Sequence, residues 1–408
     1  MKILFLTHYF PPEVNAPANR THEHARRWVQ DGHDVTVITG VPNHPTGELF
    51  PGYTNRWFQE EEVDGIRVVR TWMYLTSNRG FVRRILNYLL FAVTATLASL
   101  RTDRPDVVVA TSPQFFCGLA GVAVSWLKWR PFVLEIRDLW PDSIVQLGQL
   151  RSRGVIRLLE ALETGLYRSA AGIVVNTRAF IEHIERRGIP PERIELVYNG
   201  IDPGLFSPRS AVPALLREHD LEGKQVVAYI GTLGLAHGLM TLVEAAEQLQ
   251  DDPQLAFALI GEGADRDRIQ QEIEQRGLHN IHLLGLRPRK EIPDWIASSA
   301  VLLVMLRDLP VFETVIPSKL FEFWAQAGSI VLAAPPGECR RLVEETDSGL
   351  TIPPEDPVAL EGAVREVLAN PAAARERAEK GRQTVEASFL RDDLARRMAA
   401  FLERAARL

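Results

Sequence analysis

Short apolar runs alternate with longer amphipathic stretches along nearly the whole chain. The runs of the first half are residues 3–6, 35–39, 107–110, 132–136, 173–176 and 196–198. Those of the second half are residues 226–230, 256–260, 282–284, 301–306 and 330–333. Most of them are continuously apolar, as is typical of strands in a parallel sheet that is covered on both faces. The alternation therefore predicts an α/β fold built from doubly wound parallel sheets.

The series of runs restarts after a turn-rich stretch in the middle of the chain, Asn199-Gly200-Ile201-Asp202-Pro203. A chain of 408 residues is also longer than a typical single domain. We therefore predict two Rossmann-like domains, residues 1–205 and residues 206–385.

One helix start in the second half has the character of an anion site. Residues 316–322, Ile-Pro-Ser-Lys-Leu-Phe-Glu, follow the run at 301–306. Pro317 suits a first helical turn, where the amides of residues 318–320 lack partners and Lys319 adds a positive charge. Glu322 lies one turn further, where its carboxylate could accept hydrogen bonds from ribose hydroxyls. The pattern indicates a nucleoside diphosphate site, although an ordinary capped helix with a Lys–Glu pair explains it equally well.

Glycines follow two other predicted strands of the second half, Gly231-Thr232-Leu233-Gly234 and Gly261-Glu262-Gly263. Glycine lets the backbone approach a ligand closely, and ligands of open α/β sheets bind at strand carboxyl ends. His237 could contact phosphate or cap its turn, and Glu262 could be a ligand contact or a loop charge. The predicted donor-binding residues are Gly231, Thr232, Gly234, His237, Glu262, Pro317, Ser318, Lys319, Leu320 and Glu322.

The first half offers its own candidates at strand carboxyl ends. Arg137 and Asp138 follow the run at 132–136, where they are candidate catalytic residues or else a structural ion pair. Asn15 follows the first strand and His44 the second, in loops where a substrate would bind. We take both as candidate acceptor or cleft residues, although a lone histidine in a loop is more often a plain hydrogen-bonding group.

Residues 85–100 are the most apolar segment, and Arg83, Arg84 and Arg101 flank them. The run of about 16 residues is shorter than the ~20 that a spanning helix needs. It could be a buried helix or a helix that lies in the membrane interface, with Trp72, Tyr74 and Arg79 nearby. The first 205 residues carry 23 basic and 21 acidic side chains, whereas the remainder carries 23 and 31. The first half could therefore approach an anionic surface more easily.

Composition and cysteine spacing bear on which other kinds of protein the chain could be. Cys117 and Cys339 lie far apart without neighbours at metal-ligand spacing, so neither a disulfide framework nor a zinc site is expected. The apolar start of the chain is too short for a signal peptide and predicts a first strand instead. The net charge of −6 gives no indication of a nucleic-acid partner. Helix amides and Lys319 could neutralise a bound diphosphate without a metal ion, and we expect no bound metal.

Taken together, these motifs resemble the retaining glycosyltransferases of family 4, which have the GT-B fold. The resemblance covers essentially the whole chain. Within the family it is closest to bacterial polysaccharide enzymes of the colanic-acid and O-antigen fucosaminyltransferase type. The resemblance rests on the donor motifs above and on residues 199–202. It also rests on residues 9–13, 42–47, 83–100 and 137–141.

The resemblance implies a cleft between an acceptor-binding first domain and a donor-binding second domain, with the terminal helix, residues 386–408, packed back on the first. It implies metal-independent transfer of a hexose or N-acetylamino sugar from a nucleotide diphosphate sugar, expected to be UDP-linked, without a cofactor. The implied acceptor is a lipid-diphosphate-linked saccharide at the inner face of the plasma membrane. Asp138, Arg137 and Lys319 are the implied catalytic residues.

Three positions depart from the family pattern. Thr314, with Glu313 beside it, stands where many members have the first glutamate of an E-x7-E pair. His237 replaces a diphosphate-binding lysine, and Asn15-Ala16 replaces a glycine pair. Two other functions therefore stay open. One is a sugar-nucleotide 2-epimerase, and the other is a non-catalytic nucleotide-sugar-binding partner of a membrane assembly.

Overall fold

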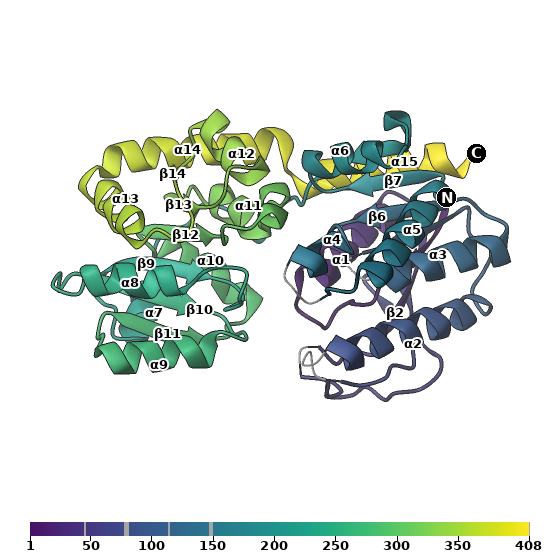
Figure 1. Ribbon diagram of the computed structural model, residues 1–408, viewed down its shortest axis with the longest axis horizontal. Coiled ribbons are helices and arrows are strands. Elements are labelled where there is room, and N and C mark those ends of the chain that lie inside the picture. The colour runs from purple at the N-terminus through teal and green to yellow at the C-terminus, as the bar shows by residue number, and fades with distance from the viewer. Residues whose placement is uncertain (45, 77–80, 113–114, 147–149, 408) are drawn as a thin grey trace. The chain divides into compact units, whose positions relative to one another are not determined.

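The computed structural model describes residues 1–44, 46–76, 81–112, 115–146 and 150–407 (Figure 1). Pro45 and Arg79, which belong to two of the motifs above, lie outside these ranges. The chain divides into a first unit, Met1–Asn199 with Arg391–Leu408, and a second unit, Gly200–Leu390. Residues 200–205 and 386–390, which we assigned to the first domain, thus belong to the second unit. The physical reason is that Phe389 packs on Phe321 and Trp324 of the second unit, with ring centroids 4.8 and 6.5 Å apart. Ile201 in turn pairs with Leu390 and donates its N–H to the carbonyl of Phe389, at 2.9 Å.

The first unit contains an eight-stranded sheet in the order β3-β4-β2-β1-β5-β6-β7-β8. All neighbouring strands are parallel except β3 and β4, which form an antiparallel edge hairpin. The strands are β1 (Lys2–Leu6), β2 (Asp34–Gly40), β3 (Gln59–Val63), β4 (Ile66–Thr71), β5 (Val107–Thr111), β6 (Phe132–Ile136), β7 (Gly172–Val175) and β8 (Ile194–Leu196). The helices are α1 (Ala16–Gln30), α2 (Phe81–Ser99), α3 (Phe115–Lys128), α4 (Asp142–Gln146), α5 (Arg153–Ser169), α6 (Arg178–Arg186) and α15 (Arg391–Ala406).

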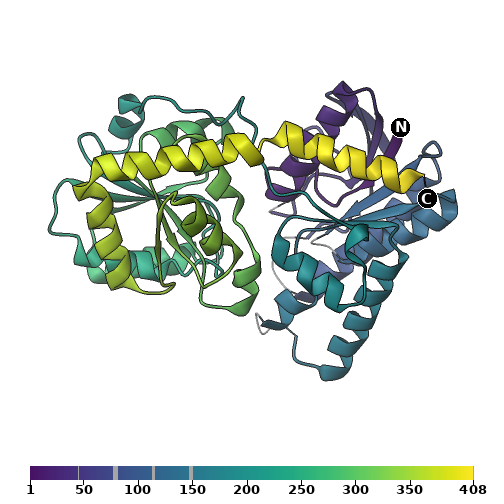
Figure 2. The ribbon, with the colours of Figure 1, turned by 90° about the horizontal axis from the view of Figure 1, so that it is seen from above.

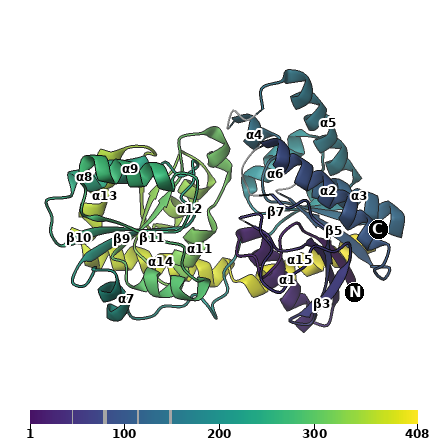
Figure 3. The same cartoon turned by 90° about the horizontal axis from the view of Figure 1, so that it is seen from below.

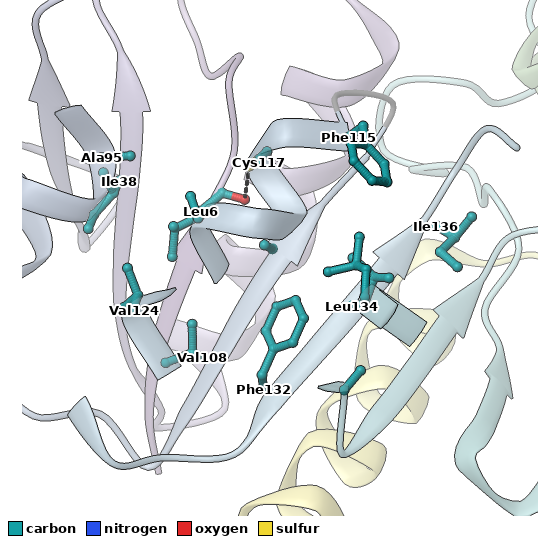
Figure 4. Packing of buried hydrophobic residues seen from close by; sticks show 14 of the residues in the cluster. Leu6, Ile38, Ala95, Val108, Phe115, Cys117, Val124, Phe132, Leu134 and Ile136 are labelled. Atoms are coloured by element: carbon teal, nitrogen blue, oxygen red, sulfur yellow. Dashed lines mark hydrogen bonds between the residues drawn. The ribbon is translucent and has the colours of Figure 1, made fainter. Parts of the chain in front are cut away.

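Alternate residues of each strand point into two separate cores. Leu4 and Leu6 of β1 face one cluster together with residues of α2, α3, α5 and α6, whereas Ile3 and Phe5 face α1 and α15. Figure 4 shows the first of these cores, in which the thiol of Cys117 donates to the carbonyl of Leu6 at 3.4 Å. Helices thus cover both faces of the sheet, which explains why its central strands are largely apolar.

The terminal helix α15 returns to the first unit and lies along it near the N-terminal strand (Figure 2). The indole N–H of Trp28 donates to the carbonyl of Ala395 at 2.9 Å, and Met398 and Leu402 are buried against the sheet. Glu195 of β8 pairs with Arg397 and Arg404 at 2.6 and 2.8 Å.

The second unit contains a parallel sheet of six strands in the order β11-β10-β9-β12-β13-β14. Its strands are β9 (Gln225–Ile230), β10 (Leu255–Ile260), β11 (Ile281–Gly285), β12 (Val301–Met305), β13 (Ile330–Ala333) and β14 (Leu350–Ile352). Its helices are α7 (Pro213–Glu218), α8 (Met240–Gln248), α9 (Arg266–Arg276), α10 (Ile292–Ala297), α11 (Ser318–Ala325), α12 (Glu338–Thr346), α13 (Pro357–Ala369) and α14 (Pro371–Ser388). Short 3-10 turns lie at Arg289–Glu291 and Pro310–Thr314 of this unit, and another lies at Pro191–Arg193 of the first unit. Two doubly wound sheets confirm the predicted fold class.

Residues 85–99 of the apolar segment lie in helix α2, and Leu100 follows the end of this helix. Phe91, Ala95 and Ala98 are buried in the core of the first unit, whereas Leu89 and Val93 are exposed. Among the residues that the structure describes, no helix is both long enough and apolar enough to cross a bilayer.

Candidate functional site

Three strand ends and one helix start converge in the second unit. The loop after β9 is tied to the loop after β10, because Gly231 N–H donates to Ile260 O at 2.8 Å and Leu233 N–H to Glu262 O at 2.9 Å. The imidazole Nδ1 of His237 lies 3.0 Å from the carbonyl oxygen of Met305, the last residue of β12. Lys319, near the start of α11, lies against the same loops.

The ammonium of Lys319 is the central group of this site. Its Nζ is buried, lies 3.8 Å from the centroid of the Tyr229 ring and has no hydrogen-bond partner in the described part of the chain. Burial lowers the pKa of Lys319 to about 7, and the carboxylate of Glu322 opposes that shift. A buried cation without an acceptor is costly, so this ammonium is ready to pair with an anion.

The glycines of the two loops are required by close approaches of the backbone. A Cβ on Gly231 would lie 2.6 Å from Lys319 Nζ, and a Cβ on Gly261 would lie 1.9 Å from the carbonyl oxygen of Gly231. Both residues have a positive φ, 144° and 146°, which side-chain-bearing residues rarely adopt. A Cβ on Gly263 would lie 2.1 Å from the carbonyl oxygen of Leu233.

The start of α11 differs in two respects from the prediction. Pro317 is the residue before the helix rather than part of its first turn, and α11 begins at Ser318. The amide of Leu320 donates to the carbonyl of Pro317 at 3.0 Å, so it is not free as predicted. The amides of Ser318 and Lys319 remain as first-turn donors at the positive end of the helix dipole.

The other predicted donor residues lie around this group with different roles. Burial and the neighbouring charge of Lys319 lower the pKa of His237 to about 4, so its imidazole is neutral at physiological pH. Glu262 forms an ion pair with Arg266 at 3.2 Å at the surface, as expected of a loop charge. Thr232 is exposed, and its carbonyl accepts a hydrogen bond from the hydroxyl of Tyr229 at 2.9 Å.

Sequence reasoning missed two features of this site. Tyr229 lies inside an apolar strand and gives no signal of its contact with Lys319. Arg307 follows β12 and pairs with Glu355 at 3.1 Å, and both side chains lie within 3.5 Å of where a Cβ on Gly238 would be. The position of Arg307 directly after a predicted strand was the available signal.

The first unit holds Arg137 and Asp138 at the carboxyl end of β6. Burial raises the pKa of Asp138, and its carboxylate accepts a hydrogen bond from Ser143 Oγ at 3.2 Å. Burial lowers the pKa of Arg137 to about 9, while the charge of Glu135 opposes that shift. Nε and Nη1 of Arg137 are buried without a hydrogen-bond partner in the described ranges. No ion pair joins the two residues in the described structure, so the structural alternative for them is not supported.

Asp138 also lines a cavity of the first unit. The aromatic rings of Phe115 and Trp140 are stacked there, 4.8 Å apart. The walls are formed by Ser112, Phe115, Gly118, Leu134, Ile136, Asp138, Trp140, Glu163, Leu166 and Tyr167. The free volume of this cavity, about 20 Å³, has room for about one water molecule.

Asn15 and His44 lie on two loops that a buried carboxylate holds together. Glu13 Oε1 accepts the backbone N–H groups of Asn43 and His44 at 3.0 and 2.9 Å, and burial raises the pKa of Glu13 to about 7. Asn15 caps α1, since its Oδ1 accepts from the amide of Ala18 at 2.9 Å. Burial lowers the pKa of His44. Glu13 is thus the residue that organises these loops.

Comparisons with known proteins agree with this architecture. Residues 15–200 match the glycosyl transferase 4-like domain, and residues 213–384 match glycosyl transferases group 1. The chain is 28% identical over 408 residues to the putative colanic acid biosynthesis glycosyl transferase WcaI of Escherichia coli K12, covering 96% of this chain and 99% of that protein. It is 28% identical over 300 residues to the probable glycosyltransferase WbjE of Pseudomonas aeruginosa, covering 71% and 72%.

Solved structures share the fold at lower identity. A sucrose-phosphate synthase from Thermosynechococcus elongatus superposes with a TM-score of 0.77 at 18% identity, over 98% of both chains. HepE from Anabaena in complex with UDP-glucose gives a TM-score of 0.72 at 18% identity, over 99% of this chain and all of that one. With both family models matched in chain order on two doubly wound units, this chain belongs to the GT4-like glycosyltransferases of GT-B fold.

Proposed function

We propose that this glycosyltransferase moves a sugar from a nucleotide diphosphate sugar to a lipid-diphosphate-linked saccharide during synthesis of a bacterial surface polysaccharide. The observation that carries the proposal is the buried ammonium of Lys319, which lies without a hydrogen-bond partner among described residues at a helix start. A diphosphate would supply the acceptor oxygens that this group lacks.

UDP is the proposed nucleotide. HepE has been solved with UDP, with UDP and glucose, and with UDP-glucose, on a fold like that of this chain. The proposed acceptor follows from the names of the relatives, one of which is described as a colanic acid biosynthesis enzyme. The family resemblance implies a lipid-linked acceptor, and we therefore propose that the protein acts at the inner face of the plasma membrane.

The proposed reaction exchanges one bond for another at the anomeric carbon of the sugar. The bond to the leaving diphosphate oxygen breaks, a bond to the acceptor hydroxyl oxygen forms, and the hydroxyl proton passes to the departing phosphate. Same-face attack would retain the configuration. Lys319 and the amides of Ser318 and Lys319 stabilise the charge that develops on the leaving oxygen, because they are in place before the reaction begins.

The remaining residues bind and orient the substrates. Glu322 lies one helical turn beyond the phosphate site and accepts hydrogen bonds from the ribose. Asp138 orients the acceptor hydroxyl, and Arg137 has buried N–H groups available for an anionic part of a substrate. His237 is neutral, and because its Nδ1–H donates to the carbonyl of Met305, its Nε2 can only accept a hydrogen bond, such as one from a substrate hydroxyl.

Incubation with labelled nucleotide sugars and bacterial membrane extract tests the proposal. Label in the lipid fraction with release of nucleoside diphosphate supports it. Conversion of the nucleotide sugar into its epimer would indicate a 2-epimerase instead. Binding without either reaction would indicate a non-catalytic nucleotide-sugar-binding protein.

A further inference from the structure

Exposed apolar side chains gather on one side of the first unit. Of the sixteen large hydrophobic side chains that are exposed in the described part of the chain, eleven lie on or directly after α2, α3 and α5. They are Leu86, Leu89, Val93, Leu97, Leu100, Trp126, Leu127, Trp129, Val155, Leu158 and Leu162. These three helices cover the same face of the sheet with α3 between the other two (Figures 1 and 3). We call their outer surface the three-helix face.

Helix α2 contributes a regular stripe to this face. Its exposed residues repeat at intervals of three or four positions, so they lie along one side of the helix. They are Leu86, Leu89, Val93 and Leu97, followed by Leu100 just beyond the helix end. The stripe is not required by the core, which the opposite side of α2 reaches through Phe91 and Ala95.

The end of α3 adds two tryptophans. Trp126 is 72% exposed and Trp129 is 83% exposed, although both are large apolar rings. The ammonium of Lys128 donates to the carbonyl of Thr102 at 2.6 Å, which ties this end to the segment after α2. Tryptophan is enriched where an apolar phase meets water, because its ring prefers the apolar phase and its N–H prefers water.

Most of the charged side chains around this face are basic. From residue 81 to residue 134 the sequence has six basic side chains and only two acidic ones, Asp103 and Asp106. Asp103 pairs with Arg67 at 3.4 Å, and Asp106 accepts the backbone N–H of Lys2 at 2.7 Å. The basic residues are Arg83, Arg84, Arg101, Arg104, Lys128 and Arg130, and they flank the apolar stretches in the sequence. Exposed Arg153 and Arg157 add to them on α5.

We infer that the three-helix face binds the surface of an anionic lipid bilayer. Apolar rows would enter the headgroup boundary while the flanking arginines meet lipid phosphates. A second copy of the chain fits less well, since a symmetric contact would set the same arginines against each other. The inference extends the proposed function, because it names the surface on which a lipid-linked acceptor would be met.

Vesicle flotation with the full chain tests this inference. One variant, Trp126→Glu with Trp129→Glu, changes the end of α3, and another, Leu89→Glu with Val93→Glu, changes α2. The matched control is Leu286→Glu with Val358→Glu, since these residues are 74% and 65% exposed on the second unit. Thermal unfolding of each variant and sedimentation without lipid accompany the flotation, and calorimetry measures UDP binding.

The wild type and the control should float with phosphatidylglycerol-containing vesicles at low salt, and less so at high salt. Each face variant should reduce the bound fraction by about tenfold or more while its unfolding temperature and UDP affinity stay near wild type. The inference is overturned if the wild type does not float at low salt, or if the face variants float as it does. A dimer that the face variants abolish, without flotation, would assign the face to a second copy. If the wild type binds UDP but does not float, the membrane inference is overturned and the proposed function is not. If it floats but does not bind UDP, the proposed donor is overturned instead.

Discussion

The ammonium of Lys319 lies over the ring of Tyr229, 3.8 Å from its centroid, in a space that Gly231 leaves open. The aromatic face partly compensates the buried charge without using the N–H groups, which stay available for a ligand. The arrangement holds the cation at the ends of β9 and β10 before any substrate binds. This is the geometry expected of a group that stabilises a leaving anion.

Removing the ammonium should impair the chemical step. Lys319→Ala is expected to lower turnover at saturating donor by on the order of 10²-fold, as for the loss of one charge-stabilising donor. Steady-state release of nucleoside diphosphate measures this directly. Unchanged turnover in a folded Lys319→Ala variant would remove the residue from the mechanism.

Binding of the nucleoside diphosphate should take up a proton above neutral pH. Burial lowers the pKa of Lys319 to about 7, so the free site is protonated below that pH and increasingly neutral above it. The bound anion favours the charged form, and affinity should therefore fall by up to about tenfold per pH unit above 7. His237 contributes nothing to this slope, because its pKa of about 4 keeps it neutral throughout.

Calorimetry in buffers of different ionisation enthalpy measures this proton uptake at pH 8. Lys319→Arg is the matched control, since its guanidinium stays charged and should remove the slope. Equal heats in all buffers for the wild type would show that Lys319 is already protonated in the free site.

Substitution of Glu322 should weaken nucleotide binding through the ribose. Glu322→Gln keeps the size of the side chain and removes its charge, so nucleoside diphosphate binding should weaken by roughly 1–3 kcal/mol. The 2′,3′-dideoxy nucleotide should bind the variant and the wild type nearly equally. Wild-type affinity of the variant for the normal nucleotide would contradict the assignment.

Substitution of Gly231 and substitution of Gly234 should have sharply different effects on activity, although both residues belong to the same loop. In Gly231→Ala the new methyl group would lie 2.6 Å from Lys319 Nζ, so the flexible ammonium should move. Donor affinity and turnover should both fall, by about tenfold or more if the ammonium leaves the phosphate site. In Gly234→Ala the methyl group makes only ordinary contact with Thr232, 3.5 Å away, and activity should be largely kept. Equal activity of the two variants would show that the space beside Lys319 is not needed.

Asp138 should affect transfer and leave donor binding intact. Asp138→Asn keeps the hydrogen bond from Ser143 but removes the negative charge, so transfer to acceptor should fall by about 10²-fold or more. The dissociation constant for UDP should stay within about twofold, because Asp138 belongs to the first unit. A parallel loss of UDP affinity would assign the residue to the donor or to folding.

Most of the fold could be predicted from the sequence because buried parallel strands are continuously apolar. The β3–β4 hairpin was missed, since Gln59-Glu60-Glu61-Glu62 is polar at the sheet edge. β14 was missed because it has only three residues, Leu350–Ile352. β8 begins two residues earlier than predicted, at Ile194, where partly exposed residues replace an apolar run.

The donor motifs were predictable because they combine glycine, proline and lysine at element boundaries. The contact between Lys319 and Tyr229 was not, because it joins residues 90 positions apart that only the folded chain brings together. The three-helix face was only partly predictable. The arginine-flanked segment at 85–100 gave a signal, whereas the exposure of Trp126 and Trp129 depends on which side of α3 meets the sheet.

We propose that a nucleotide diphosphate sugar is the donor and that Lys319 assists its cleavage. The most direct measurement is single-turnover transfer from a labelled UDP-sugar panel to membrane extract, comparing wild type with Lys319→Ala at saturating donor. We expect label in the lipid fraction with equimolar UDP for at least one donor, and a rate about 10²-fold lower for the variant. Equal rates for the two proteins, or nucleotide-sugar binding without transfer from any donor tried, would contradict it.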